Sequence, residues 1–281
     1  MRTLIVSNRL DPFNGNLGDF ASDPSLYFPW LANARRVQLD RLGAWIIPSP
    51  RLGGANVIVG GGGLLAPNLP TFNSGWRRVV KNADRSRLVL WGAGLNSHLN
   101  SPVKPSGGKF NMYSSLRQFR LVGLRDDLHD YRWVPCPSVM LTELSRDYQV
   151  KREAVVYDNW QFQWNKAALE LPHMQNNRRF ASSEVKRQEV SEVIAFLASA
   201  ETVLTSSYHG ALWATLLGKK VVVTRPFSNK FMFFKHPPVT LREGEEWHEA
   251  AKRAQIYPDI LGEYQQVTND FADEVREIFG L

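Results

Sequence analysis

The chain has 281 residues, of which 43% are hydrophobic and 22% charged, so it can bury one large core or two medium ones. Its single cysteine, Cys136, excludes an intramolecular disulfide framework. The formal net charge of +7 is spread along the chain without a basic tract or a nucleic-acid-binding motif, so we expect anionic substrates and no nucleic-acid partner.

Long apolar runs are missing from the sequence. The first run, residues 4–6, is too short for a signal peptide, and no other approaches the roughly 18 residues of a membrane-spanning helix. We therefore expect a soluble cytoplasmic protein. The positive net charge leaves open a peripheral position at the inner face of the membrane.

Short apolar strands alternate with helical patterns in the first half of the chain. Helical spacing of apolar residues predicts a helix within residues 28–44, and residues 113–119 fit another. Apolar runs predict strands at 3–7, 55–63 (running into a four-glycine loop), 87–94 and 119–127, with a short extended segment at 133–139.

The same alternation restarts in the second half. Strands are predicted at 153–159, 202–207 and 219–225. Helices are predicted at 182–200, 209–217 and 267–279, the first of them capped by Ser182 or Ser183.

Two successive runs of strand–helix units predict an α/β protein with two Rossmann-like domains and parallel sheets. The boundary falls near 140–152, which gives domains of residues 1–150 and 151–281. The terminal helix, 267–279, can pack back on the first domain. Ligands of such sheets bind beyond the carboxyl ends of the strands, so we expect the active site in the cleft between the domains.

Glycine-rich loops follow the first three predicted strands. In G-N-L-G-D, Asn16, Gly18 and Asp19 can face a ligand or form a turn with a helix cap. The loops with Gly61, Gly62 and Gly63 and with Gly92 and Gly94 follow buried strands, and we expect them to face a ligand rather than to be tight structural turns. None fits the dinucleotide-binding or phosphate-loop pattern.

Two side chains are the sharpest catalytic candidates. Arg125, just past an apolar strand, can clamp a carboxylate or phosphate, or pair with Asp126 or Asp127. His209 lies at a helix start, where the helix dipole favours a neutral ring that acts as a base, or as an acid once an anion binds. The histidines show no paired spacing and Cys136 stands alone, so we expect no metal and no cofactor.

The ordered motifs resemble the polysaccharide pyruvyl transferase family. They are G-N-L-G-D, VIVGGGGLL, LVLWGAGL, VGLRDD and VLTSSYHGALWATLLGKKVVV, which together cover most of the chain. The resemblance implies a two-domain, glycosyltransferase-B-like fold. It also implies transfer of the enolpyruvyl unit of phosphoenolpyruvate to a sugar, which forms a ketal-linked pyruvate on a cell-surface glycan or exopolysaccharide.

The resemblance also implies roles for residues. His209 corresponds to the general acid that protonates the enol ether carbon or the bridging oxygen, and Arg125 to the residue that holds phosphoenolpyruvate. The first domain would be the acceptor side and the second the donor side. The donor would be bound by Ser206, Ser207, Tyr208, Gly210, Arg225 and Lys230.

Two positions depart from the family pattern. Ser207 stands where members commonly have an arginine that contacts the donor, and Cys136-Pro137 replaces an Asp-Pro pair. Losing a guanidinium removes up to two charge-assisted hydrogen bonds of roughly 1.5–3 kcal/mol each. Arg225, Lys230 or Lys235 could replace it.

Three functions remain open at this point. The first is pyruvyl transfer from phosphoenolpyruvate to a saccharide, free or lipid-linked. The second keeps the fold but uses a sugar-nucleotide donor, as a glycosyltransferase does, which Ser207 and the nine tryptophans motivate. The third is a non-catalytic glycan-binding homologue, which the presence of both His209 and Arg125 disfavours.

Overall fold

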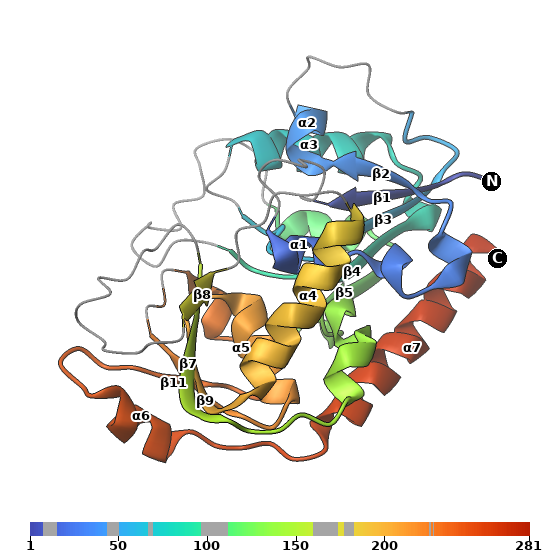
Figure 1. Cartoon of the computed structure of the whole chain (residues 1–281). Helices are drawn as coiled ribbons and strands as arrows, with labels where there is room; N and C mark the ends of the chain where they lie inside the picture. The colour runs from blue at the N-terminus through green and yellow to red at the C-terminus, as the bar shows by residue number, and fades with distance from the viewer. Residues whose placement is uncertain are drawn as a thin grey trace.

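The structure is a computed structural model that describes residues 1–7, 16–43, 51–66, 70–96, 112–159, 174–176, 183–224, 226 and 228–281. Within these residues, two parallel β-sheets lie side by side with helices around them (Figure 1). The chain is therefore an α/β protein with parallel sheets.

The first sheet contains six strands of the described chain, and all their pairings are parallel. In spatial order they are β2 (Arg35–Gln38), β1 (Thr3–Ser7), β3 (Asn56–Gly60), β4 (Leu88–Ala93), β5 (Leu121–Leu124) and β6 (Arg132–Trp133).

The second sheet contains five described strands, again all parallel. Their spatial order is β11 (Val239–Thr240), β10 (Lys220–Val223), β9 (Ala200–Thr205), β7 (Arg152–Asp158) and β8 (Met174–Asn176).

The α-helices are α1 (Leu17–Ala21), α2 (Leu39–Gly43), α3 (Pro70–Asn82), α4 (Ser183–Ala198), α5 (Tyr208–Leu216), α6 (Trp247–Arg253) and α7 (Ile260–Phe279). Short 3₁₀ helices span Pro24–Leu26, Pro29–Leu31, Arg85–Arg87, Ser114–Gln118, Pro137–Met140, Thr142–Ser145 and Asn229–Phe231.

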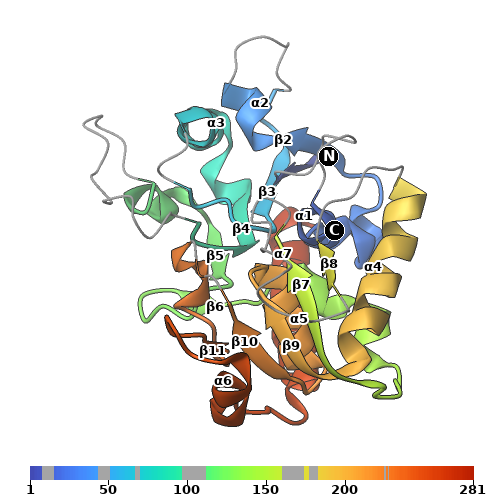
Figure 2. The ribbon, with the colours of Figure 1, turned by 60° about the vertical axis from the view of Figure 1, so that its left-hand side comes forward.

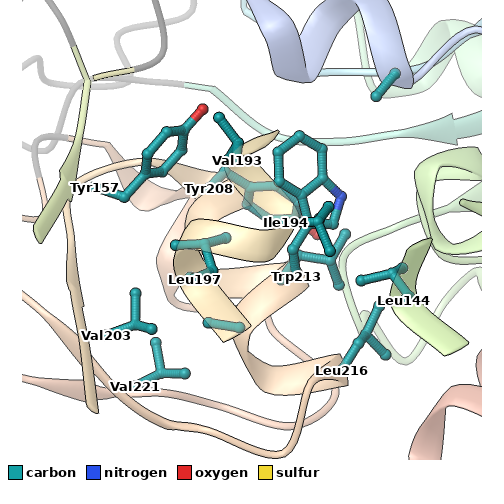
Figure 3. Close-up of a cluster of buried hydrophobic side chains, with 14 of the residues drawn as sticks. Leu144, Tyr157, Val193, Ile194, Leu197, Val203, Tyr208, Trp213, Leu216 and Val221 are labelled. Carbon is teal, nitrogen blue, oxygen red and sulfur yellow. The ribbon is translucent and has the colours of Figure 1, made fainter. Parts of the chain in front are cut away.

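Both faces of each sheet are covered, which explains why the central strands are continuous apolar runs. Helices α2 and α3 pack on one face of the first sheet, around the buried Trp76. In the second sheet, α4 and α5 cover one face and α6 covers the other. Figure 3 shows side chains of α4 and α5 meeting those of β7, β9 and β10.

Helix α7 crosses back to the first sheet although it follows the second in the chain (Figure 1). Phe271 is fully buried, and its ring lies 5.4 Å from that of Trp91 on β4. Ile5, Ile58 and Val275 belong to the same cluster. Helix α7 thus helps to cover the second face of the first sheet.

One hydrophobic cluster joins the two sheets. Leu17 and Phe20 of α1 pack in the same cluster as Val193 of α4 and Trp213 of α5, together with Val139 from the connection between the sheets. In Figure 2, α1 lies between the first sheet and α4. The two halves therefore share part of their core.

The helix predicted within residues 28–44 is wrong. Pro29 begins a 3₁₀ turn, β2 follows, and only Leu39–Gly43 is helical. The apolar spacing that resembled a helix comes from three short elements that each bury side chains. Residues 113–119 form a 3₁₀ rather than an α-helix, and in 133–139 a two-residue strand ends before Pro137 opens another 3₁₀ turn.

The other predicted elements are close to those observed, with shifted ends. Helix α7 begins at Ile260, well before residue 267, and the helix with His209 begins at Tyr208. Ser183 lies within α4, and Ser182 is outside the described residues. In the described part of the chain, none of the helices combines the length and apolarity needed to cross a membrane.

Truncating Phe271 tests the role of α7. We expect Phe271→Ala to lower the free energy of unfolding by about 3–5 kcal/mol, because it leaves a cavity against Trp91. Denaturant unfolding would measure the loss, with exposed Glu277→Ala on the same helix as the control. Equal effects of the two changes would contradict a structural role for α7.

Candidate functional site

Loops from both sheets converge at the carboxyl ends of the strands. Gly61–Gly63 follow β3, Gly94 follows β4 and Arg125 follows β5, while His209 opens α5 after β9. Parallel strands present their carboxyl ends at one edge of their sheet, and contacts between the two sets of loops bring these edges together.

Cross-links hold the loop after β10 against the first sheet. Ser228 Oγ donates to Asn96 Oδ1 at 3.1 Å, and the Asp127 N–H donates to the Phe233 carbonyl at 2.8 Å. Lys235 Nζ lies 3.4 Å from Asp127 Oδ2. Because these bonds bracket residue 230, they bring Lys230 toward the ends of β4 and β5.

His209 packs directly against the first motif of the chain. A Cβ added at Gly18 would lie 2.0 Å from Nδ1 of the ring, closer than any real contact. The ring therefore fits only because residue 18 has no side chain. His209 is 5% exposed, and its ring lies 5.4 Å from those of Tyr208 and Trp213.

The other ring nitrogen of His209 is held by two buried side chains. Nε2 lies 3.0 Å from Ser22 Oγ and 3.4 Å from Cys136 Sγ. Ser22 follows α1 and Cys136 precedes the 3₁₀ helix Pro137–Met140, so both come from the half of the chain that holds the first sheet. Neither residue was predicted to belong to the site. Ser22 carries no sequence signal, whereas the replacement of the family's Asp-Pro pair by Cys136-Pro137 marked position 136 without indicating its contact with His209.

Arg125 is buried, 3% exposed, with its guanidinium carbon 3.7 Å from the centre of the Tyr208 ring. Stacking on an aromatic face suits a delocalised cation. Its Nε has no hydrogen-bond partner among the described residues. A Cβ at Gly94 would lie 2.2 Å from that Nε, so this glycine makes room for the arginine.

Lys230 and Asp19 complete a group of buried or half-buried charges. Burial, reinforced by the charge of Arg125 and opposed by Asp19, lowers the pKa of Lys230 to about 7. Burial raises the pKa of Asp19 to about 6, although Arg125 and Lys230 act the other way. The charge of Arg125 thus disfavours protonation of Lys230, and the two cations lie close enough to act on the same group.

The same surroundings keep the His209 ring neutral. Burial is the largest cause, and the charges of Arg125 and Lys230 add to it, so the pKa of His209 lies well below its usual 6.5. At neutral pH the free protein therefore presents an imidazole, which can accept a proton but has no second proton to give.

Asp126, expected from the sequence only as a partner of Arg125, also anchors the loop after β4. Its Oδ2 accepts the Leu95 N–H at 2.5 Å, and the residue is 1% exposed. Burial raises the pKa of Asp126 to about 6, against the opposing effects of Arg125 and of the hydrogen bond from Leu95.

The glycines predicted to face a ligand make close contacts within the protein. Gly61 and Gly62 both have φ near +77°, and added Cβ atoms would approach Ser22 and Asp19 respectively. Gly63 packs on Asn96. Gly92 has φ +61° and packs on Pro135 and Pro137. These glycines let α1 and the loops approach one another closely.

The segment before His209 is occupied with local bonding. Ser206 Oγ donates to Asp158 Oδ1 at 2.7 Å, and Ser207 caps α5 by accepting the Gly210 N–H at 3.3 Å. A Cβ at Gly210 would meet Thr205 and Tyr157. None of these contacts joins the charge group around Arg125.

Asn16 has a similar capping role in α1, where its Oδ1 accepts the Gly18 N–H at 2.8 Å. Tyr208 supplies the ring under Arg125, and burial raises the pKa of its hydroxyl well above the ordinary range. Arg225 lies outside the described residues. No group of three or more metal-ligating side chains is found in the residues that the structure describes.

The whole chain can now be compared with known proteins. The sequence model of the polysaccharide pyruvyl transferase family matches residues 6–226. The chain belongs to this family. The matched region includes Gly18, Arg125 and His209, and the family name indicates a transferase with a polysaccharide acceptor and a pyruvyl donor. No curated protein matches the chain.

Two solved structures are similar to this member of the polysaccharide pyruvyl transferase family. A functionally uncharacterized protein of Klebsiella pneumoniae superimposes with a TM-score of 0.51 and 15% identity, over 82% of this chain and 85% of that chain. This likeness shows the fold alone. The wall teichoic acid polymerase TagF, soaked with CDPG, gives a TM-score of 0.35 and 10% identity, over 98% and 84% of the two chains.

Gly18→Ala tests the contact between α1 and His209. The added methyl would overlap the ring, so we expect the free energy of unfolding to fall by about 1–3 kcal/mol. Gly262→Ala is the matched control, because it is also a helical glycine and its added Cβ meets nothing within 4 Å. It should be neutral or slightly stabilising. If Gly18→Ala changed the free energy of unfolding no more than Gly262→Ala does, the close contact between Gly18 and His209 would be contradicted.

The raised pKa of Asp126 predicts a pH dependence of stability. The folded state holds this proton more tightly than the unfolded state does, whose pKa is near 3.8. The contribution to stability is therefore fully present below about pH 4 and lost as the pH rises through about 6.

We expect Asp126→Asn to remove this dependence and to raise the free energy of unfolding at pH 7, relative to wild type, by about 2–3 kcal/mol. Denaturant unfolding at several pH values would measure it, with exposed Asp127→Asn as the control. Identical pH profiles of wild type and Asp126→Asn would contradict the assignment.

Proposed function

We propose that this chain transfers pyruvate, as a ketal, from phosphoenolpyruvate to a saccharide of a bacterial cell-surface glycan or exopolysaccharide. The observation that supports it most is the group formed by Arg125, Lys230 and the neutral His209 in a member of the pyruvyl transferase family. The donor carries a phosphate and a carboxylate, and both need cationic partners.

In this proposal Arg125 and Lys230 bind the anionic groups of the donor. Arg125 is suited to bidentate recognition because Tyr208 holds its guanidinium flat and its Nε has no partner among the described residues. Lys230 takes over the charge that members of the family place at position 207. An anionic donor would also favour full protonation of Lys230, whose pKa burial and the charge of Arg125 lower to about 7.

His209 acts first as a base and then as an acid. Its neutral ring removes the proton of the attacking sugar hydroxyl while that oxygen bonds to C2 of phosphoenolpyruvate. As the C2–O bond forms, the resulting imidazolium, stabilised by the bound anion, protonates C3 to a methyl group, so the electron pair of the C2=C3 double bond becomes the new C–H bond and no carbanion forms. This second step is the general acid role that the family resemblance implies.

Loss of phosphate completes the reaction. The bond between C2 and the bridging oxygen breaks, and a second sugar hydroxyl bonds to C2 to close the ketal. The proton of that hydroxyl leaves with the phosphate. Each transfer therefore consumes one phosphoenolpyruvate and releases one inorganic phosphate.

Acceptor-dependent phosphate release from phosphoenolpyruvate tests the proposal over a panel of free and lipid-linked saccharides. We expect His209→Gln to lower kcat by about 10²–10⁴-fold. His248→Gln, at an exposed histidine, is the control and should not change the rate. Release of a nucleoside diphosphate from a sugar nucleotide instead would refute the pyruvyl donor.

Removing the positive charge of Arg125 or Lys230 should mainly weaken the binding of the donor. We expect Arg125→Gln and Lys230→Gln each to weaken phosphoenolpyruvate binding about 10–100-fold, from the loss of a charge-assisted hydrogen bond. Arg132→Gln, at a half-exposed arginine, serves as the control. Titration calorimetry gives the affinities, and unchanged values for both site variants would contradict the assigned roles.

A further inference from the structure

A chain of buried hydrogen bonds runs from Trp213 to Gly18. The indole N–H of Trp213 donates to Ser138 Oγ at 3.1 Å, and Ser138 Oγ donates to Cys136 Sγ at 3.3 Å. Cys136 Sγ donates to Ser22 Oγ at 3.2 Å, and Ser22 Oγ donates to the Gly18 carbonyl at 2.6 Å. Every side chain in this series is at least nine-tenths buried.

The two ends of the series fix its direction. An indole N–H can only donate and a carbonyl oxygen can only accept, so each hydroxyl or thiol between them passes its proton toward Gly18. The contact of 2.6 Å between Ser22 Oγ and the carbonyl oxygen requires a proton between the two atoms. Only Ser22 can supply it, so its oxygen can only accept from its other neighbours.

This constraint decides which nitrogen of His209 carries the proton. Nε2 lies 3.0 Å from Ser22 Oγ, whose own proton points at Gly18. If Nε2 were unprotonated, its lone pair would face a lone pair of Ser22 Oγ at 3.0 Å, which is repulsive. Nε2 therefore carries the proton and donates a hydrogen bond to Ser22 Oγ. Because burial keeps the ring neutral, Nδ1 carries the free lone pair.

Gly18 covers the face of the ring and leaves the lone-pair direction of Nδ1 uncovered. An added Cβ would lie 2.0, 2.5 and 2.7 Å from Nδ1, Cγ and Cε1 of His209. A carbon on the in-plane lone-pair axis would be farther from Cγ and Cε1, so Gly18 lies above the ring. Nδ1 accepts no hydrogen bond from the part of the chain that the structure describes.

We propose that Ser22 and Cys136 are positioning residues that hold the proton of His209 on Nε2, so that Nδ1 is the atom that exchanges protons with the substrate. The reaction itself rests on the proposed function, whereas the tautomer does not. Cys136 contributes as an acceptor for Ser138 and as a donor to Ser22, which orients the hydroxyl that receives Nε2–H.

The tautomer can be measured without substrate. Long-range proton–nitrogen NMR spectra of protein labelled with ¹⁵N-histidine distinguish protonated from bare ring nitrogens, and His209→Gln identifies the signals. We expect Nε2 to be protonated and Nδ1 unprotonated in wild type and in Cys136→Ser. A serine hydroxyl at position 136 can make both hydrogen bonds of the thiol, accepting from Ser138 and donating to Ser22. Ser22→Ala should give a mixture of tautomers.

Thr268→Ala is the matched control, since it also removes a buried hydroxyl that donates to a helical carbonyl at 2.9 Å. It should leave the His209 signals unchanged. A proton on Nδ1 in wild type, or a pure Nε2–H form in folded Ser22→Ala, would overturn the proposal. If Ser22→Ala fails to fold, the spectra of wild type and Cys136→Ser decide.

Kinetics add a second measurement. We expect Ser22→Ala to lower kcat about tenfold or more while KM for phosphoenolpyruvate stays nearly constant, because the tautomer matters for proton transfer and not for donor binding. Cys136→Ser should retain most of the rate. If wild type turns over no acceptor, the proposed function fails while the tautomer measurement still stands.

Discussion

The contact between Gly18 and the ring of His209 is the constraint on which the site depends. It joins residues that are far apart in the sequence, one after the first strand of the first sheet and one after a central strand of the second. The contact forms because Leu17 and Phe20 of α1 are buried in a core shared with α4 and α5. The catalytic candidate is therefore defined by tertiary packing rather than by one motif.

Buried or half-buried charges of both signs gather around that contact. Arg125 and Lys230 are buried near each other, and each lowers the tendency of its neighbours to be protonated. Buried cations are costly unless an anion compensates them. Asp19 and Asp126 offset part of this cost, and a buried group of titratable side chains with shifted pKa values is typical of functional sites.

The sequence was sufficient for the strands with continuous apolar character, and for the place of Arg125 after a strand and of His209 in the first turn of a helix, while their roles in the site stay predictions. Such strands are recognisable because both sheet faces are covered. It was not sufficient for residues 28–44, where three short elements produced a helix-like spacing. It could not find Ser22, and it marked Cys136 only as a departure from the family's Asp-Pro pair, since the proximity of both to His209 follows from the shared core.

The path of α7 has a consequence for how the chain folds. The face of the first sheet that carries Ile58 and Trp91 is covered in part by Phe271 and Val275, which follow all the described strands in sequence. During synthesis, Phe28 and Trp30 can pack on Trp91 early, but the part of this face that α7 covers stays exposed until the second sheet has also been made. Such long-range closure slows folding and exposes strand surface to other chains. We infer that the first half cannot complete its fold ahead of the second, so the two sheets mature as one cooperative unit.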